Sequence, residues 1–299
     1  MDRLDIDFTS SGTRCAAWHY EPEGDGKYPY VVMAHGLGGT REGQLAPFAE
    51  RFAAAGYGVL VFDYRYWGDS DGEPRQLLSV SRQLQDWRAA FDFVRTLPKV
   101  DSQRVALWGS SFGGGHAITT AAKVPGVAAA IAQVPFADGL QSLLALRPLT
   151  AIRLTFAAIA DVALALIGRG PVYVPLLGRP GEVALMSAAD SYDGYMSIVP
   201  ETAITSGNWV NRAAARIALT LPLYSPRRHA KHVTAPLLVL TAAKDTIAPA
   251  RGAVTAAKNA VAGELKTYDG GHFDYYMGVG FEKIVADEIE FLDRHLKHG

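Results

Sequence analysis

The chain has 299 residues, of which 49% are hydrophobic and 20% are charged. A chain of this length and composition can bury a large core, which excludes an intrinsically disordered protein. Lys and Arg together number 29 against 30 Asp and Glu, with no long run of one sign. This balance indicates neither a nucleic-acid partner nor an anionic-membrane patch.

Three further features bear on location and metal binding. Cys15 is the single cysteine, so the chain can form no intrachain disulfide, zinc cluster or redox pair. Residues 1–7 are polar and acidic, so we expect no secretory signal and a cytoplasmic protein. The most apolar stretch, residues 154–168, is interrupted by Asp161 and flanked by arginines. Since a membrane span needs about 20 apolar residues, this stretch predicts a buried or cap helix instead.

Apolar β-rich runs alternate with helical runs along the first half of the chain, after a predicted N-terminal hairpin at residues 5–9 and 14–20. The expected strands are 30–35, 58–63, 104–109 and 127–134, and the expected helices are 44–55, 77–97 and 112–123. Strands that alternate with crossover helices are typical of a parallel sheet.

The pattern stops near residue 138 and resumes near residue 236. The second part is expected to contain strands at 236–241 and 264–268 and helices at 251–262 and 281–296. The segment between residues 138 and 236 is rich in Leu, Ala and Ile, and Pro/Gly pairs divide it into several predicted helices. An insert of this size needs structure of its own, and one usual role is a lid over an active site. We therefore predict an α/β core of residues 1–137 and 233–299, with a helical cap at 138–232.

Residues 109–113 read Gly-Ser-Ser-Phe-Gly, which is G-x-S-x-G between a predicted strand and a predicted helix. In such a turn a serine hydroxyl is presented at the end of the strand, and the flanking glycines let the helix approach. The motif alone is common by chance, and a turn of small residues without chemistry is the alternative. The strand before it favours Ser111 as a nucleophile, supported by Gly109 and Gly113.

A serine nucleophile needs a base, and the base needs an orienting third group. Among the eight histidines, His272 follows the last predicted strand in the glycine-rich turn 270–272, which makes it the candidate base. Histidines at other positions lie in segments predicted to be polar helix or tail: His229, His232, His295 and His298.

The candidate acid is Asp245, which follows the predicted strand 236–241. Open α/β sheets build their sites at the carboxyl ends of strands, and the order Ser, acid, His matches this assignment. Asp269 and Asp274 are alternatives that lie close to His272 in sequence. The orienting acid normally arrives on a separate loop, which favours Asp245.

Residues 35–39 read His-Gly-Leu-Gly-Gly directly after the first long strand. Such a turn frees backbone N–H groups to face the crevice, so Leu37 and Phe112 are the predicted oxyanion-hole donors, supported by His35 and Gly36. The alternative is a phosphate cradle. The turn lacks the lysine and Ser/Thr of a P-loop and the spacing of a dinucleotide fingerprint, so we expect no cofactor and no metal.

The loop at residues 63–72 is dense in aromatic residues, charges and glycines. It could line a substrate pocket, or a buried ion pair between Arg65 and Asp69 could fix it, and we favour the structural role. His116, on the helix after the elbow, is expected to be packed and not catalytic.

With these motifs in order, the chain resembles the α/β-hydrolase superfamily. Residues 62–75, FDYRYWGDSDGEPR, resemble the corresponding loop of dienelactone-hydrolase-like and Xaa-Pro dipeptidyl-peptidase-like hydrolases. Residues 173–182 and 271–276 are similar to the polyketide transferase and thiohydrolase branch. The resemblance implies a mostly parallel eight-stranded sheet, a helical cap after the sixth strand, and activity on acyl esters or thioesters.

The predicted function is that of a carboxylesterase-like serine hydrolase that cleaves an ester or thioester of a hydrophobic small molecule through an acyl-enzyme on Ser111. Acyl transfer and cofactor-free perhydrolysis use the same triad and remain alternatives, whereas a dehalogenase would need a carboxylate at the elbow. A non-catalytic receptor for a small ligand would be expected to lack a triad member. The expected partner is the small-molecule substrate, with no nucleic acid and no membrane span, and the oligomeric state, including a homodimer, stays open.

Overall fold

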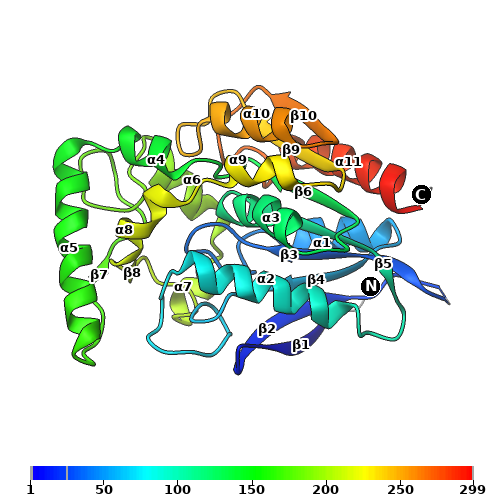
Figure 1. Ribbon diagram of the computed structural model, residues 1–299, viewed down its shortest axis with the longest axis horizontal. Helices are drawn as coiled ribbons and strands as arrows, with labels where there is room; N and C mark the ends of the chain where they lie inside the picture. The colour runs from blue at the N-terminus through cyan, green and yellow to red at the C-terminus, as the bar shows by residue number, and fades with distance from the viewer. Residues whose placement is uncertain (1–2, 25, 298–299) are drawn as a thin grey trace.

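The computed structural model describes residues 3–24 and 26–297. The outermost residues of the predicted core, 1–2 and 298–299, therefore lie outside the described residues, as does His298. Figure 1 shows a central sheet with helices on both sides and a mostly helical unit at one end.

The eight strands of the main sheet lie in the order β1-β2-β4-β3-β5-β6-β9-β10. Their bounds are β1 Arg3–Ser10, β2 Thr13–Tyr20, β3 Tyr28–Ala34, β4 Gly58–Phe62, β5 Val100–Ser110, β6 Ala129–Gln133, β9 Leu237–Ala242 and β10 Gly263–Tyr268. β2 runs antiparallel to β1 and β4, and the remaining pairs are parallel. The predicted mostly parallel eight-stranded sheet, with its insertion after the sixth strand, is confirmed.

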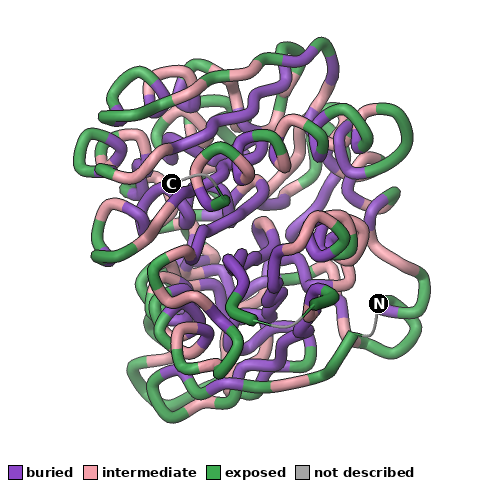
Figure 2. Tube along the Cα trace, turned by 90° about the vertical axis from the view of Figure 1, so that its right-hand side faces the viewer, coloured by how far each residue is buried: buried purple, intermediate pink, exposed green. Residues whose placement is uncertain are grey.

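Alternate side chains of the central strands point to opposite faces of the sheet and give two cores. Helices α2 (Val80–Val94), α3 (Phe112–Lys123) and α10 (Ala250–Asn259) cover one face. Helices α1 (Ala46–Ala54) and α11 (Gly278–Leu292) cover the other. Buried residues follow the strands in the interior of the molecule, and exposed ones lie on the outer loops and helix faces (Figure 2). The last helix ends earlier than expected, at Leu292, and a π-helical turn follows it.

The segment between β6 and β9 forms most of the unit at the end of the molecule. It contains α4 Gly139–Ala145, α5 Pro148–Leu166, α6 Ser191–Ile198, α7 Glu201–Thr205, α8 Ile217–Thr220 and α9 Pro226–His229. A short antiparallel ladder of β7 (Tyr173–Val174) and β8 (Ala213–Ala214) was not expected, because strands of two residues give no visible alternation. α9 packs against α3 and α10 of the core. An ion pair between Asp138 and Arg227 joins the two ends of the insert.

Helix α5 is long and apolar enough to cross a bilayer by length and composition, a test that a core helix of a soluble protein can also pass. Four of its residues are buried: Thr150, Leu154, Ala158 and Asp161. The Asp161 carboxylate accepts hydrogen bonds from the Arg216 guanidinium at 2.7 and 2.9 Å. α5 is therefore a cap helix packed along one side only, and not the buried helix that its composition also allowed.

The loop after β4 is held by ion pairs other than the one expected. Arg65 pairs with Asp86 of α2 at 2.5 Å, and Asp69 pairs with Arg41 at 2.7 Å. The predicted Arg65–Asp69 pair is wrong, because each side chain meets a partner from another part of the chain. The buried Asp63 also accepts the backbone N–H of Arg41 at 2.7 Å. These contacts give the loop a structural role.

A buried carboxyl group lies behind the strand that leads to Ser111. The Trp108 indole N–H donates to Glu288 Oε1 at 2.9 Å, and Glu288 is fully buried on α11. Burial raises the pKa of Glu288 well above its ordinary value of 4.5. The folded protein therefore keeps the proton on Glu288 at pH values where the unfolded chain has lost it.

Substitution of Glu288 should change how the free energy of unfolding depends on pH. Above pH 4.5 the unfolded chain binds fewer protons than the folded one, so Glu288 lowers the free energy of unfolding as pH rises toward its folded pKa. Glu288→Gln keeps an acceptor for Trp108 and removes this loss, which amounts to about 1.4 kcal/mol per pH unit at most. In urea unfolding at about pH 5 and about pH 8, the variant should gain stability relative to wild type at the higher pH. A constant difference between the two proteins would contradict the assigned protonation.

Candidate active site

Ser111 lies between the end of β5 and the start of α3, with φ of 55° and ψ of −117°. This is an uncommon backbone conformation for a residue with a side chain, and it persists only where the surroundings hold it. The Ser111 N–H donates to the carbonyl of Gln133 at 2.9 Å, and its own carbonyl accepts from the N–H of Phe136 at 2.8 Å. Strand β6 and the residues after it therefore fix the turn.

The glycines of the motif are required by close backbone contacts. A Cβ atom on Gly109 would lie 2.1 Å from the carbonyl oxygen of Gly113. A Cβ atom on Gly113 would lie 2.6 Å from the carbonyl oxygens of both Ala34 and His35. Helix α3 can therefore start directly against β5 and β3 only with glycine at both positions, which is the physical content of the G-x-S-x-G pattern.

His272 follows β10, is buried, and forms a 2.7 Å hydrogen bond from Nδ1 to Asp245 Oδ2. Asp245 follows β9, and its Oδ1 accepts the backbone N–H groups of Ile247 at 2.9 Å and Ala248 at 2.7 Å. These bonds fix the direction of the carboxylate. Because Nδ1 carries the donated proton, Nε2 of a neutral His272 ring is free to act as a proton acceptor.

The two alternative acids have other partners. Asp269 forms an ion pair with Lys244 at 2.8 Å, and its side chain is 79% exposed. Asp274 accepts the backbone N–H of Gly271 at 2.8 Å and so stabilises the turn that carries His272. Of these three carboxylates, Asp245 is the one bonded to the imidazole.

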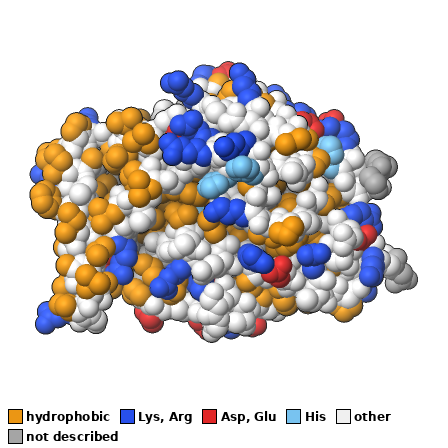
Figure 3. All heavy atoms as spheres, in the orientation of Figure 1, with side chains coloured by type: hydrophobic (Ala, Val, Ile, Leu, Met, Phe, Trp, Pro, Cys, Tyr) orange, Lys and Arg blue, Asp and Glu red, His pale blue; other side chains and the backbone are white. Residues whose placement is uncertain are grey.

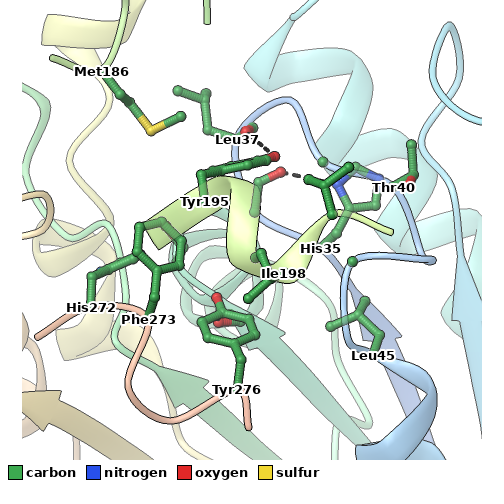
Figure 4. A pocket seen from close by; sticks show the side chains of 16 residues that line it. His35, Leu37, Thr40, Leu45, Met186, Tyr195, Ile198, His272, Phe273 and Tyr276 are labelled. Atoms are coloured by element: carbon green, nitrogen blue, oxygen red, sulfur yellow. Dashed lines mark hydrogen bonds between the residues drawn. The ribbon is translucent and has the colours of Figure 1, made fainter. Parts of the chain in front are cut away.

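Ser111 and His272 line the same pocket. Figure 4 shows this pocket, with His272 and Phe273 on one side of it and Leu37 and Tyr195 among the other labelled side chains. A second pocket, with a cavity volume of about 190 Å³, also starts at Ser111 and Leu37 and extends beneath the cap to α4. Met186 of the cap lines both. The candidate nucleophile therefore lies where the two pockets meet.

The backbone around Leu37 is anchored by two cap side chains. The Tyr195 hydroxyl donates to the carbonyl of Leu37 at 3.1 Å, and the Trp209 indole N–H donates to the carbonyl of Gly38 at 2.9 Å. Phe112, the other predicted donor, opens α3, where the first N–H groups of a helix have no partner within it. Tyr195 and Trp209 were not expected to contribute, because they lie in the insert, outside every motif.

His35 is buried beside this turn and supports it. Its Nδ1–H donates to the carbonyl of Gly36 at 3.0 Å. Burial lowers the pKa of His35 to about 4, so the ring is neutral near pH 7. His116 is also buried, with Nδ1 bonded to Tyr224 and Nε2 to Gln83, and burial lowers its pKa to about 3. Both histidines are buried and bonded within the fold. The sequence had predicted such a packed position for His116.

The turn that carries His272 packs against the cap. Phe273 contacts Gly194 of α6, where a Cβ atom would lie 2.3 Å from the ring. The Thr246 hydroxyl, on the loop of Asp245, donates to Asp190 at the start of α6. The cap therefore contacts the loops of His272, Asp245 and Leu37. Within the described residues, no group of three or more His, Cys, Asp or Glu is placed to hold a metal.

The family model Hydrolase_4, described as serine aminopeptidase S33, matches residues 28–275. The chain belongs to this α/β-hydrolase family. It is 45% identical to the quorum-quenching protein AidA of Acinetobacter baumannii (strain MDR-ZJ06), over 97% of this chain and 94% of that protein.

Two kinds of relative named in the sequence-based resemblance are also found. The chain is 27% identical to the polyketide transferase grgF of a Penicillium species, over 99% of this chain and 98% of that protein. It is 27% identical to a thiohydrolase of Eupenicillium brefeldianum, over 83% of this chain and 79% of that protein. The solved structure of the α/β hydrolase GrgF from Penicillium sp. sh18 superposes with a TM-score of 0.83 at 25% identity, covering 99% of this chain and all of that one. The predicted resemblance is confirmed.

The first site prediction concerns the acid. Asp245→Asn removes the negative charge beside His272 and the acceptor that fixes its tautomer, so kcat on a chromogenic ester should fall by about 10³- to 10⁴-fold. Asp269→Asn is the matched control, since it removes an exposed ion pair and should change kcat less than about twofold. The opposite ranking of the two variants would reassign the acid.

The second site prediction concerns the anchor of the turn at Leu37. Tyr195→Phe removes the hydroxyl that donates to the Leu37 carbonyl while keeping the ring in place. We expect kcat to fall about tenfold with little change in KM, because displacing the candidate oxyanion donor at Leu37 would weaken transition-state binding more than substrate binding. Tyr192→Phe, on the same helix, is the control and should behave as wild type. Equal kinetics of the two variants would exclude the positioning role.

Proposed function

We propose that the protein is a serine hydrolase that cleaves a carboxylic ester or thioester of a hydrophobic small molecule through an acyl-enzyme on Ser111. The observation that carries this proposal is the 2.7 Å bond between His272 and Asp245, with His272 lining the same pocket as Ser111 on its strained turn. The arrangement supports nucleophilic catalysis, in which a serine is activated by an oriented imidazole.

In the proposed reaction, His272 Nε2 accepts the hydroxyl proton of Ser111 as Oγ attacks the acyl carbon. The N–H groups of Leu37 and Phe112 stabilise the oxyanion, and Asp245 stabilises the imidazolium. The bond to the leaving alcohol or thiol then breaks, and the leaving group takes the proton from His272. His272 then accepts a proton from a water molecule as that water attacks the acyl carbon of the acyl-enzyme. The bond between the acyl carbon and Ser111 Oγ breaks, His272 returns the proton to Oγ, and the carboxylic acid leaves.

The pocket beneath the cap supports a hydrophobic substrate. Most of its walls are apolar, and the larger apolar side chains are Leu37, Phe112, Phe136, Leu146, Leu185, Met186, Leu221 and Ile247. Ligand sites are usually apolar cavities with a few placed polar groups. The name of the thiohydrolase relative supports a thioester as one form of the substrate.

A second candidate is acyl transfer, favoured by the likeness to polyketide transferases over nearly the whole chain. The same triad would form the same acyl-enzyme, and an alcohol would take the place of water in the second half of the reaction. The non-catalytic receptor is disfavoured, because the chain keeps a serine, a histidine and an aspartate at all three positions.

The test is a panel of chromogenic esters with short and long acyl chains, together with acyl thioesters. We expect turnover to increase with acyl length and Ser111→Ala to reduce kcat at least about 1,000-fold. Ser102→Ala, on the same strand and away from the pocket, is the control. Undiminished turnover by Ser111→Ala would overturn the mechanism. Addition of an alcohol acceptor separates the two candidates, since a new ester as the main product would assign the protein as a transferase.

A further inference from the structure

The outer side of α5 is an apolar surface open to solvent. Hydrophobic side chains gather over α4 and α5 at one end of the molecule (Figure 3). The large exposed side chains there are Leu140, Leu144, Leu149, Ile152, Phe156, Ile159, Val162, Leu166 and Ile167, which we call the α5 face. Phe156 is 70% exposed and Leu166 is 82% exposed. A contiguous exposed apolar area of this kind marks an interaction site more often than ordinary surface.

The charges around the α5 face are of one sign. Between residues 139 and 181 the single carboxylate is Asp161, which is buried on the opposite side of α5 against Arg216. Arg153 and Arg169 are exposed along and after the helix, and Arg147, before the helix, is exposed and also lines the pocket that starts at Ser111. Within the described residues, none of these three guanidinium groups has a hydrogen-bond or ion-pair partner.

The apolar α5 face and the arginines around it favour a lipid bilayer over a second copy of the chain as the binding partner. Cationic side chains beside an apolar face match the anionic headgroups and acyl chains of a lipid surface. A second copy of the chain on the same face would place arginines near arginines, with no acidic residue of that segment exposed to pair with them. Charge complementarity therefore favours a bilayer.

The cavities beneath the cap lead toward the same face. The pocket that extends from Ser111 beneath the cap to α4 shares four lining residues with a third cavity, which lies between α4 and α5. The shared residues are Ser142, Leu146, Leu185 and Leu221. That cavity in turn shares Leu143, Leu146, Ala151 and Thr155 with an open groove. Ile152 and Phe156 of the α5 face line the groove. A row of adjacent, mostly apolar cavities thus extends from the candidate nucleophile to the exposed surface.

We propose that the α5 face docks on an anionic lipid bilayer, and that an acyl substrate held in the bilayer enters toward Ser111 between α4 and α5. The helix would lie in the plane of the interface, as amphipathic helices do. It would not cross the bilayer, because the Asp161–Arg216 pair in its middle holds its inner side on the cap. The entry route rests on the proposed function, whereas the docking does not.

Docking is tested with Ser111→Ala protein, so that binding is measured without turnover. The probe is sedimentation with vesicles of phosphatidylcholine alone, or with about 30% phosphatidylglycerol. We expect binding to the anionic vesicles that weakens with salt, and binding at least about tenfold weaker to phosphatidylcholine alone. An Ile159→Ser, Leu166→Ser double variant and, separately, Arg153→Glu should each weaken binding about tenfold. Val279→Ser, which changes an 87% exposed side chain on α11, is the matched control.

Three outcomes would overturn the docking proposal: absence of sedimentation with anionic vesicles, equal binding of the α5 variants and Val279→Ser, or a lipid-free dimer that the double variant abolishes. Circular dichroism of each variant shows that it is folded. The entry route is tested in the Ser111 protein with a long-chain ester carried in anionic vesicles. The double variant should lower that turnover about tenfold and leave a water-soluble short ester unchanged. Equal loss on both esters would overturn the entry route alone.

Discussion

The close approach of α3 to β5 and β3 is the constraint on which the rest of the structure depends. It places Ser111 at a positive φ, at the carboxyl edge of the sheet, and it leaves no room for a side chain at Gly109 or Gly113. Backbone hydrogen bonds to this turn, from the end of β6 and from the residues after it, hold the strained conformation. The loops after β9 and β10 then bring Asp245 and His272 to the same edge.

The cap does more than cover this edge, because it bonds to the loops that carry the candidate catalytic groups. Tyr195 and Trp209 hold the carbonyl groups beside Leu37, Phe273 packs on α6, and Thr246 is bonded to Asp190. Rearrangement of the cap would therefore alter the geometry of the site as well as access to it. This coupling gives a physical reason for a large insert at this point of the sheet.

The net charge of the whole chain and the local charge around α5 differ. The chain is nearly neutral overall, which gave no indication of a membrane partner. The fold nevertheless turns Asp161 inward against Arg216 and leaves Arg147, Arg153 and Arg169 at the surface, so the region around α5 is locally cationic. Likewise, the apolar composition of α5 was compatible with burial, and only packing left one side of the helix without a partner.

The sequence by itself determined the order of strands and helices, the fold class, the elbow around Ser111, and the residue types required for the candidate triad. These features are local, since each is written in a strand-to-turn or turn-to-helix pattern of a few residues. Tertiary structure decided which of Asp245, Asp269 and Asp274 is bonded to His272. It also replaced the expected Arg65–Asp69 pair by Arg65–Asp86 and Arg41–Asp69, and it added the contacts of Tyr195 and Trp209. Those outcomes depend on contacts between residues that are distant in the chain. A local sequence pattern does not predict which distant residue a side chain will contact.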